Sequence, residues 1–425
     1  TLEQLEAWSI LLFKKHKKSY SLYEGSDFDI DAAIEEAFDH VPQLDFDRLR
    51  KAAGFQPIVA KKHYHHTGAL RWMDVDLVPS EQAQKRAAEY EPSHGAMGLF
   101  MVVLGAEDEH EEELEKLCKK ASKAQKTWPT VASIAQNAYL IRSHAKELQA
   151  LEWIKGNNPA LGGDTVARRE VESRLALMRD RLSEYLQQTL SDAEWFVDGK
   201  AAEKLSFEDL HQLTSQKANQ LYKFSPHINS ELANRIKPSS NSNAALKLLL
   251  KAMVEQVGHE RLGIEGYPAE GGLYDILLDN TGLYNGKNFV QPSSKKDPCN
   301  IAAVWSAADS YFEENKDRPV SLTELYDLWL APPYGIKNGM LPFFAIAYIM
   351  TKINDYAAYL EGVYRPSIDD FFIDILMKSP SDIALRRMDF SDVGQKILAG
   401  VCDTLNRISD KEKPLDETLE PLEIA

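Results

Sequence analysis

Three closely spaced histidines are the residues of this sequence best suited to metal chemistry. His63, His65 and His66 lie in the run KKHYHH, and on a strand His63 and His65 would point to the same side. A zinc site needs three or four ligands, and no nearby cysteine or well-placed carboxylate completes the set. We therefore expect a structural hairpin here, and a metal-dependent enzyme site that also uses Asp74 and Asp76 stays open as an alternative.

The sequence carries no recognisable motif for phosphate binding or acyl transfer. It has no GxxxxGK[ST] loop, no GxGxxG turn and no GxSxG elbow. The run GLYNGKN at residues 282–288 has too short a spacing and ends in Asn instead of Ser or Thr. A nucleotide would therefore lack the backbone amides that usually bind its phosphates. We expect no catalytic activity and no cofactor in this chain.

The charge balance argues against nucleic acid as a general partner. The 425 residues include 65 acidic and 49 basic side chains, which gives a net charge of −16. Such a chain repels a phosphate backbone overall, so binding would need local basic patches. The candidate contacts for a nucleic-acid-binding alternative are Lys14, Lys15, Lys17, Lys18 and Lys337.

Cysteine content and hydropathy indicate a cytoplasmic protein. Cys118, Cys299 and Cys402 are far apart and form no CxxC, so we expect neither a disulfide framework nor a thiolate metal site. The longest apolar stretches, residues 98–105 and 340–350, fall well short of the roughly 20 residues that span a bilayer. We expect no membrane partner.

Hydrophobic patterning predicts an α+β, predominantly α-helical chain of several domains. The first, residues 1–92, is a helical segment with helices at 2–18, 30–39 and 46–53 and a β-hairpin at 61–78 that turns at Thr67 and Gly68. The second, residues 93–205, begins with the continuous apolar run 98–106, which is typical of a strand buried on both faces. A helix at 107–126 and a strand at 130–136 would complete a small βαβ unit.

The same domain continues with two long helices, at 138–153 and 165–190. Apolar residues of the second helix step by four and three, and a breaker-rich loop separates the helices, so we expect a long antiparallel helical hairpin. Residues 206–300 form a helical domain with helices at 206–222 and 243–255. Residues 301–425 form the last domain, with helices at 369–377 and 392–408 and an acidic tail.

The last domain contains the sharpest local pattern. Ser321 and Glu324 form a capping-box signature that opens a helix at 322–330. A second helix at 341–352 and a hairpin at 357–364 follow, an order typical of a winged helix. Few bases accompany this unit, and its second helix is apolar on most faces. We expect that helix to be buried, and DNA contact by the unit is the alternative.

Several phrases together resemble a region of very large bacterial ATP-binding proteins, some of them found with phage-defence gene clusters of the BREX type. The resemblance covers most of the chain, keeps the blocks in order and corresponds to the region that follows the nucleotide-binding domain. It assigns no catalytic residue. The phrases that carry it lie at residues 25–34, 61–78, 150–172, 231–253, 260–284 and 325–349.

The resemblance implies a non-catalytic regulatory or interaction region of a larger ATP-binding protein. The absence of a Walker motif and the start at Thr1 instead of Met then indicate a segment that does not contain the ATP site. Its expected partners are other domains or subunits of an ATPase assembly, with at most weak, non-specific DNA binding. A nucleic-acid-binding module and a metal-dependent enzyme are the two alternatives.

Overall fold

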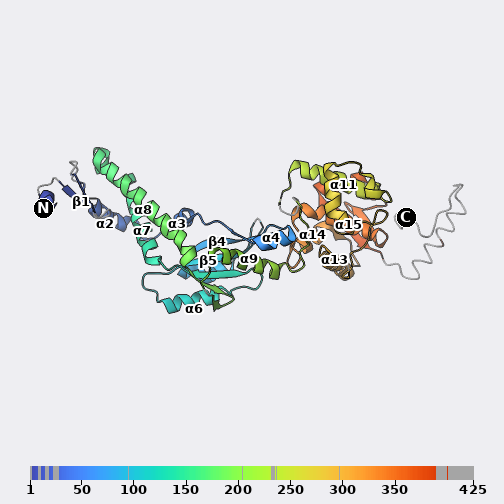
Figure 1. Ribbon diagram of the computed structural model, residues 1–425, viewed down its shortest axis with the longest axis horizontal. Helices are drawn as coiled ribbons and strands as arrows, with labels where there is room; N and C mark the ends of the chain where they lie inside the picture. Colours follow the sequence, from blue (N-terminus) through green and yellow to red (C-terminus); the bar gives the residue numbers. More distant parts are fainter. Residues whose placement is uncertain are drawn as a thin grey trace. The chain divides into compact units, whose positions relative to one another are not determined.

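The computed structural model describes two compact units built from helices and sheets (Figure 1). The described residues are 2–7, 11–14, 19–22, 28–93, 95–202, 204–230, 235, 237–295, 297–388 and 400. The first unit comprises residues 1–59 and 72–211, and the second comprises residues 60–71 and 212–425. The fold is mixed α/β with helices predominating. No described helix has both the length and the apolar composition needed to cross a bilayer.

A six-stranded sheet forms the centre of the first unit. Its three middle strands are parallel and its outer strands pair antiparallel. The expected βαβ unit is confirmed, and every residue of the continuous apolar strand is buried because both faces of the sheet are covered. The strands in spatial order are β3 (Ile58–Val59), β4 (Trp72–Pro79), β5 (Ala96–Leu104), β6 (Thr130–Ile134), β7 (Glu194–Val197) and β8 (Lys200–Ala201). The parallel connections are α5 (Ser80–Ala88) and α6 (Glu111–Ala121).

A second core of the first unit lies along a long amphipathic seam, and three of the four helices in this region contribute to it. Val171, Leu175 and Met178 of the seam are buried there, as the four-three spacing predicts. The guanidinium of Arg174 pairs with Asp31 and Glu147, both at 2.6 Å, and so joins three of the helices. The helices that form this core are α2 (Ile30–His40), α7 (Ala138–Asn157) and α8 (Thr165–Asp192). The fourth helix, α3 (Phe46–Ala53), packs against α8.

The prediction of a helix over residues 2–18 is correct only for residues 2–7. Helix α1 (Leu2–Ala7) is followed by the antiparallel strands β1 (Leu11–Lys14) and β2 (Ser19–Leu22). Phe13 and Tyr20 are cross-strand partners with ring centroids 5.0 Å apart. Such aromatic pairs stabilise a two-stranded ribbon, which overrides the helical pattern of the local sequence.

The expected hairpin over residues 61–78 is also wrong. Residues 61–67 form helix α4 (Lys61–Thr67) in the second unit, and only β4 is extended. The supposed turn glycine, Gly68, is the left-handed cap of this helix (φ 73°), and its amide donates to the carbonyl of Tyr64. A Cβ at Gly68 would lie 2.2 Å from the carbonyl oxygen of Ile228. Long-range packing against residue 228 therefore selects the helix, and no local pattern encodes it.

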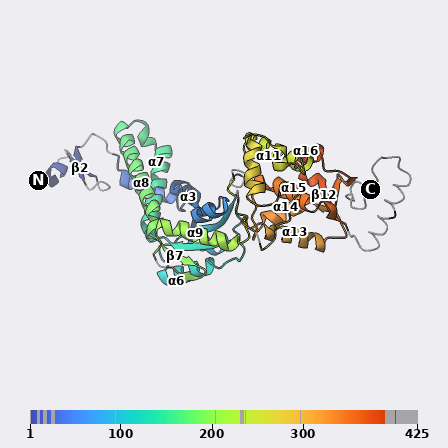
Figure 2. The same ribbon diagram turned by 45° about the vertical axis from the view of Figure 1, so that its right-hand side comes forward.

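One large apolar core lies within the second unit. The helices of this unit after residue 240 are drawn in yellow to red in Figure 2. Helix α15 (Leu341–Thr351) lies at the centre of the core, with Leu341 and all residues from Phe343 to Ile349 buried. Around it are α11 (Ser240–Glu255), α12 (Ala269–Tyr274), α13 (Ala302–Glu314), α14 (Leu322–Leu330) and α16 (Asp370–Lys378). The same unit also includes α9 (Phe207–Leu221) from residue 212 on. The capping box of α14 is confirmed. The hydroxyl of Ser321 accepts from a backbone amide of the first turn, and the carboxylate of Glu324 accepts from the amide of Ser321.

A four-stranded antiparallel sheet accompanies these helices, in the order β11 (Val363–Arg365), β10 (Tyr356–Leu360), β12 (Ile383–Arg387) and β9 (Val320–Ser321). The turn at Glu361 and Gly362 between β10 and β11 lies where the sequence predicts it. The pairing of β12 between β10 and β9 was not predicted. The expected helix at 392–408 and the acidic tail lie outside the described residues, apart from residue 400.

Candidate functional site

The two histidines proposed as metal ligands do not converge. On helix α4 they are two residues apart, which places them about 200° apart around the axis. His63 is 1% exposed and its Nδ1 lies 2.7 Å from Oδ1 of Asn219, whereas His65 is exposed. Across the part of the chain that the structure describes, no three or more His, Cys, Asp or Glu side chains gather as a metal site would require.

The basic residues proposed as phosphate contacts lie in different settings. Lys14 ends strand β1, and Lys15, Lys17 and Lys18 lie outside the described residues. Lys337 lies in the segment between α14 and α15 and is half-buried. Burial, followed by the nearby charge of Arg71, lowers the pKa of Lys337 to about 7. Lys337 is therefore part of an internal cluster and not of an open basic surface.

Arg71, which the sequence did not single out, is the centre of that cluster. Its side chain is 3% exposed, and its guanidinium carbon lies 3.5 Å from the ring centroid of Tyr222. One guanidinium nitrogen donates to the carbonyl oxygen of Gly335, while Nε has no partner. Arg71 makes no ion pair with any residue that the structure describes. Burying a cation without a carboxylate partner costs roughly several kcal/mol of desolvation free energy, so this arrangement is unusual.

Three segments far apart in the sequence assemble the cluster. The amide of Ala60 donates to the carbonyl of Arg71 at 2.9 Å and closes the loop that contains α4. The amide of Ile228 donates to Thr67 at 3.1 Å, which holds the segment after α9 against the end of α4. Gly335, in the segment before α15, has φ 62°. A Cβ there would lie 2.3 Å from the Tyr222 ring, so only glycine admits the stacked pair.

The charges of the cluster are all positive or potentially positive. Burial lowers the pKa of His63 to about 4, so this imidazole is neutral near pH 7. His66 and His227 lie with ring centroids 4.1 Å apart, and burial also lowers the pKa of His227. We define the basic cluster as Arg71, Lys337, His63, His66 and His227. Nε2 of His63 is a second buried nitrogen without a partner.

A small cavity opens beside the basic cluster. Its volume is about 20 Å³, which is room for one water-sized group. Thr67, Ser225, Gly335 and Lys337 line it together with apolar side chains. The cluster offers hydrogen-bond donors and positive charge, and it has no pairing of a nucleophile with a base. Such an arrangement suits the binding of a negative group better than proton transfer.

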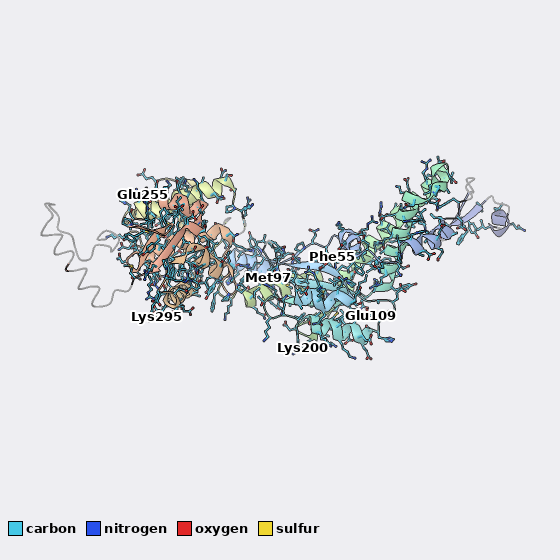
Figure 3. All side chains as sticks on the ribbon, turned by 180° about the vertical axis from the view of Figure 1, so that it is seen from behind. Phe55, Met97, Glu109, Lys200, Glu255 and Lys295 are labelled. Atoms are coloured by element: carbon cyan, nitrogen blue, oxygen red, sulfur yellow. The ribbon has the colours of Figure 1, made fainter. Side chains whose placement is uncertain are left out.

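The edge of the sheet where parallel strands usually bind ligands is filled by the chain's own side chains. At the end of β5, Arg142 donates from Nη2 to the carbonyl of Leu104 at 3.0 Å and from Nε to Gly105 at 2.5 Å. Glu109, labelled in Figure 3, accepts from the amide of Ala106 at 2.6 Å. The strand ends are therefore already satisfied, and this edge is not the candidate site.

A groove with a mainly apolar lining lies between α3, α7 and α8 in the first unit. Its volume is about 560 Å³, and Leu44, Leu49 and Leu148 contribute apolar lining. The carboxylate of Glu152 holds the rim by pairing with Arg48 at 2.7 Å and with Arg179 at 2.9 Å. An open groove of this composition favours a protein segment over a charged small molecule.

One signal for the basic cluster was present in the sequence. Arg71 lies between Leu70 and Trp72 at the start of a strand-like run, and a basic residue that becomes buried at such a position needs a partner. Its neighbours in space are 150 to 270 residues away, so the sequence does not name that partner. Comparison of the chain with protein-family models, with curated proteins and with solved structures gave no match.

Proposed function

We propose that this chain is a non-catalytic regulatory or interaction region of a larger bacterial, cytoplasmic ATP-binding protein and does not itself hold the ATP site. The observation that carries the proposal is the burial of α15, the helix that a winged-helix reader would place in the DNA groove. The resemblance described above supports the ATP-binding parent and the association with phage defence.

The finer architecture belongs to this proposal. Apart from short 3-10 turns, residues 302–387 run in the order helix, strand, helix, helix, strand, strand, helix, strand, and the sheet places β12 between β9 and β10. This order supports an elaborated winged helix in which β11 and α16 are inserted into the wing. α7 and α8 pack along each other and are joined by a short loop, which supports the antiparallel helical hairpin.

Within that winged helix, α15 is used for packing. Its buried residues contact the core formed by α11, α13 and α14, so exposing it to a DNA groove would cost most of the apolar burial of the unit. A winged helix whose reading helix is internal acts as a protein-packing module. The groove of the first unit is then the surface on which we place the contact with the parent's nucleotide-binding part.

The test uses the parent gene. The region upstream of Thr1 should encode a Walker motif, and that region, expressed separately, should bind this chain in calorimetry. Ser183→Arg, which places a long charged side chain in the groove, should weaken the binding at least about tenfold, since it blocks roughly 1.4 kcal/mol of contact or more.

The matched control is Ser143→Arg, the same chemical change at an exposed position of α7 that does not line the groove. The control should bind like the natural chain. A parent gene without a Walker motif, or equal binding by both variants, contradicts the proposed function or its placement in the groove, respectively.

A further inference from the structure

One surface of the first unit collects lysines, although the whole chain carries a net charge of −16. Residues 116–126, the second half of α6 and the turn that follows it, include five lysines and no acidic residue. Among them, Lys119 pairs with Glu115 at 2.5 Å. The other four are exposed, as is Lys200 of β8, and no carboxylate of the described residues pairs with any of these side chains. We define the lysine patch as Lys116, Lys120, Lys123, Lys126 and Lys200.

Two segments far apart in the sequence build the lysine patch. The hairpin of β7 and β8 is fixed to the end of α6, because the amide of Gly199 donates to Oγ of Ser122 at 2.9 Å. The side chain of Lys123 lies directly over Gly199, where an added Cβ would be 2.0 Å from Cε of the lysine. Lys200, labelled in Figure 3, is the next residue of the hairpin. Positive charges from both segments therefore share one surface.

The fold itself gains little from this concentration of charge. Lysines in the last turn of a helix interact favourably with its dipole, which accounts for Lys120. Lys126 lies beyond the helix and Lys200 belongs to another element, so the dipole accounts for neither. Lys116 and Lys120 share the face of α6 that points away from the buried Cys118, and like charges four residues apart repel. The patch therefore indicates an anionic partner outside the chain.

We infer that the lysine patch is a contact surface for the phosphate backbone of a nucleic-acid duplex. Residues 111–128 and 194–202 include no exposed large apolar side chain, and Trp128 is packed against the core of the unit. Protein partners and membrane surfaces are usually held through such side chains, and single strands stack on exposed aromatic rings. A duplex backbone requires only positive charge. The inference uses residues of the first unit alone and does not depend on the proposed function.

The number of lysines sets the salt dependence of this contact. Five lysines neutralise at most five phosphates, so the logarithm of the affinity should fall against the logarithm of the salt concentration with a slope of about −4 to −5. Between about 50 mM and about 150 mM salt, the affinity should therefore fall about a hundredfold. Contacts to phosphates alone carry no sequence information, so no sequence preference is expected.

The experiment is fluorescence anisotropy of a labelled, random-sequence DNA duplex titrated with the full chain at several salt concentrations. One variant combines Lys116→Gln with Lys120→Gln on the helix, and a second combines Lys123→Gln with Lys200→Gln around the hairpin. Each variant should weaken binding at about 50 mM salt at least about tenfold, and should make the slope less negative by about 2, since each lost phosphate contact contributes about 0.9.

The matched control combines Lys287→Gln with Lys295→Gln, which removes the same charge from exposed positions of the second unit. The control should keep the affinity and the slope of the natural chain. Undetectable binding by the natural chain at low salt, an equal loss in the control, or a loss in only one of the two patch variants overturns the surface.

Competition identifies the partner. An unlabelled RNA duplex should displace the DNA duplex, because both present phosphates along a paired helix, and failure of the RNA to compete overturns a contact made through phosphates alone. Poly-glutamate and phosphatidylserine vesicles of the same total charge should not compete. Displacement by either of them as effective as by unlabelled duplex would assign the patch to an acidic protein or a membrane surface and overturn the inference.

Discussion

Replacement of Gly335 by alanine tests the packing that holds the basic cluster together. Gly335 has φ 62°, and an added Cβ would lie 2.3 Å from Cδ1 of Tyr222 and 2.4 Å from Nη2 of Arg71. The alanine therefore meets a rigid ring and a guanidinium that is already bonded to the carbonyl of residue 335. Either the ring leaves Arg71 or the segment before α15 moves away.

The cost has two parts that can be separated. A left-handed alanine costs about 1–2 kcal/mol relative to glycine. Displacing Tyr222 from Arg71 removes a desolvated cation–π contact of about 2 kcal/mol. We therefore expect Gly335→Ala to destabilise the second unit by about 3–4 kcal/mol. Gly362→Ala is the control, because Gly362 has φ 80° and no heavy atom within 4 Å of the added Cβ. Gly362→Ala should therefore destabilise the second unit only by the backbone cost of about 1–2 kcal/mol.

Hydrogen exchange of the α15 amides reports the free energy of opening of the second unit, independently of the stability of the first unit. The expected difference of about 2 kcal/mol between the variants corresponds to an exchange rate about thirtyfold faster in Gly335→Ala than in Gly362→Ala. Equal exchange rates in the two variants would refute the reasoning. They would mean that the Tyr222 ring and the Arg71 guanidinium move aside without loss of stability and do not hold the segment around Gly335 in place.

Three further predictions concern the rest of the chain. Leu175→Asp places a charge in the buried seam of α8, where Leu175 is 3% exposed, and should lower the thermal midpoint of the first unit by at least about 6 °C; a midpoint within one degree of the natural chain speaks against a buried seam. The lowered pKa of Lys337 means that the unfolded chain binds more protons than the folded chain between about pH 7 and 10.5, so the free energy of unfolding should rise with pH across that window. Urea unfolding of Lys337→Met should lack this rise. An equal dependence of the unfolding free energy on pH in both proteins refutes the assignment. Binding of a random DNA duplex, followed by fluorescence anisotropy, should be weak and disappear near physiological salt, because the chain carries a net charge of −16; submicromolar affinity at that salt would instead favour the nucleic-acid-binding alternative.

The sequence alone determined the elements whose signals are local. The continuous apolar run predicted the strand β5, because a strand covered on both faces has no polar side. Ser321 and Glu324 predicted the start of α14, since a capping box involves groups only three residues apart. The four-three spacing predicted which residues of α8 are buried, because helical periodicity is a property of the segment itself.

Only the tertiary structure decided the fate of residues 61–71 and the candidate site. KKHYHHT has no strong periodicity of its own, and its helix depends on the contact of Gly68 with Ile228, a residue of another segment. Arg71, Tyr222 and Lys337 lie together because three chain segments pack against one another. The charged side chains of Arg71 and Lys337 lose their hydration only through this packing. A sequence records which residues can carry charge, but burial and proximity arise from long-range packing, and these decide which charges lose their hydration.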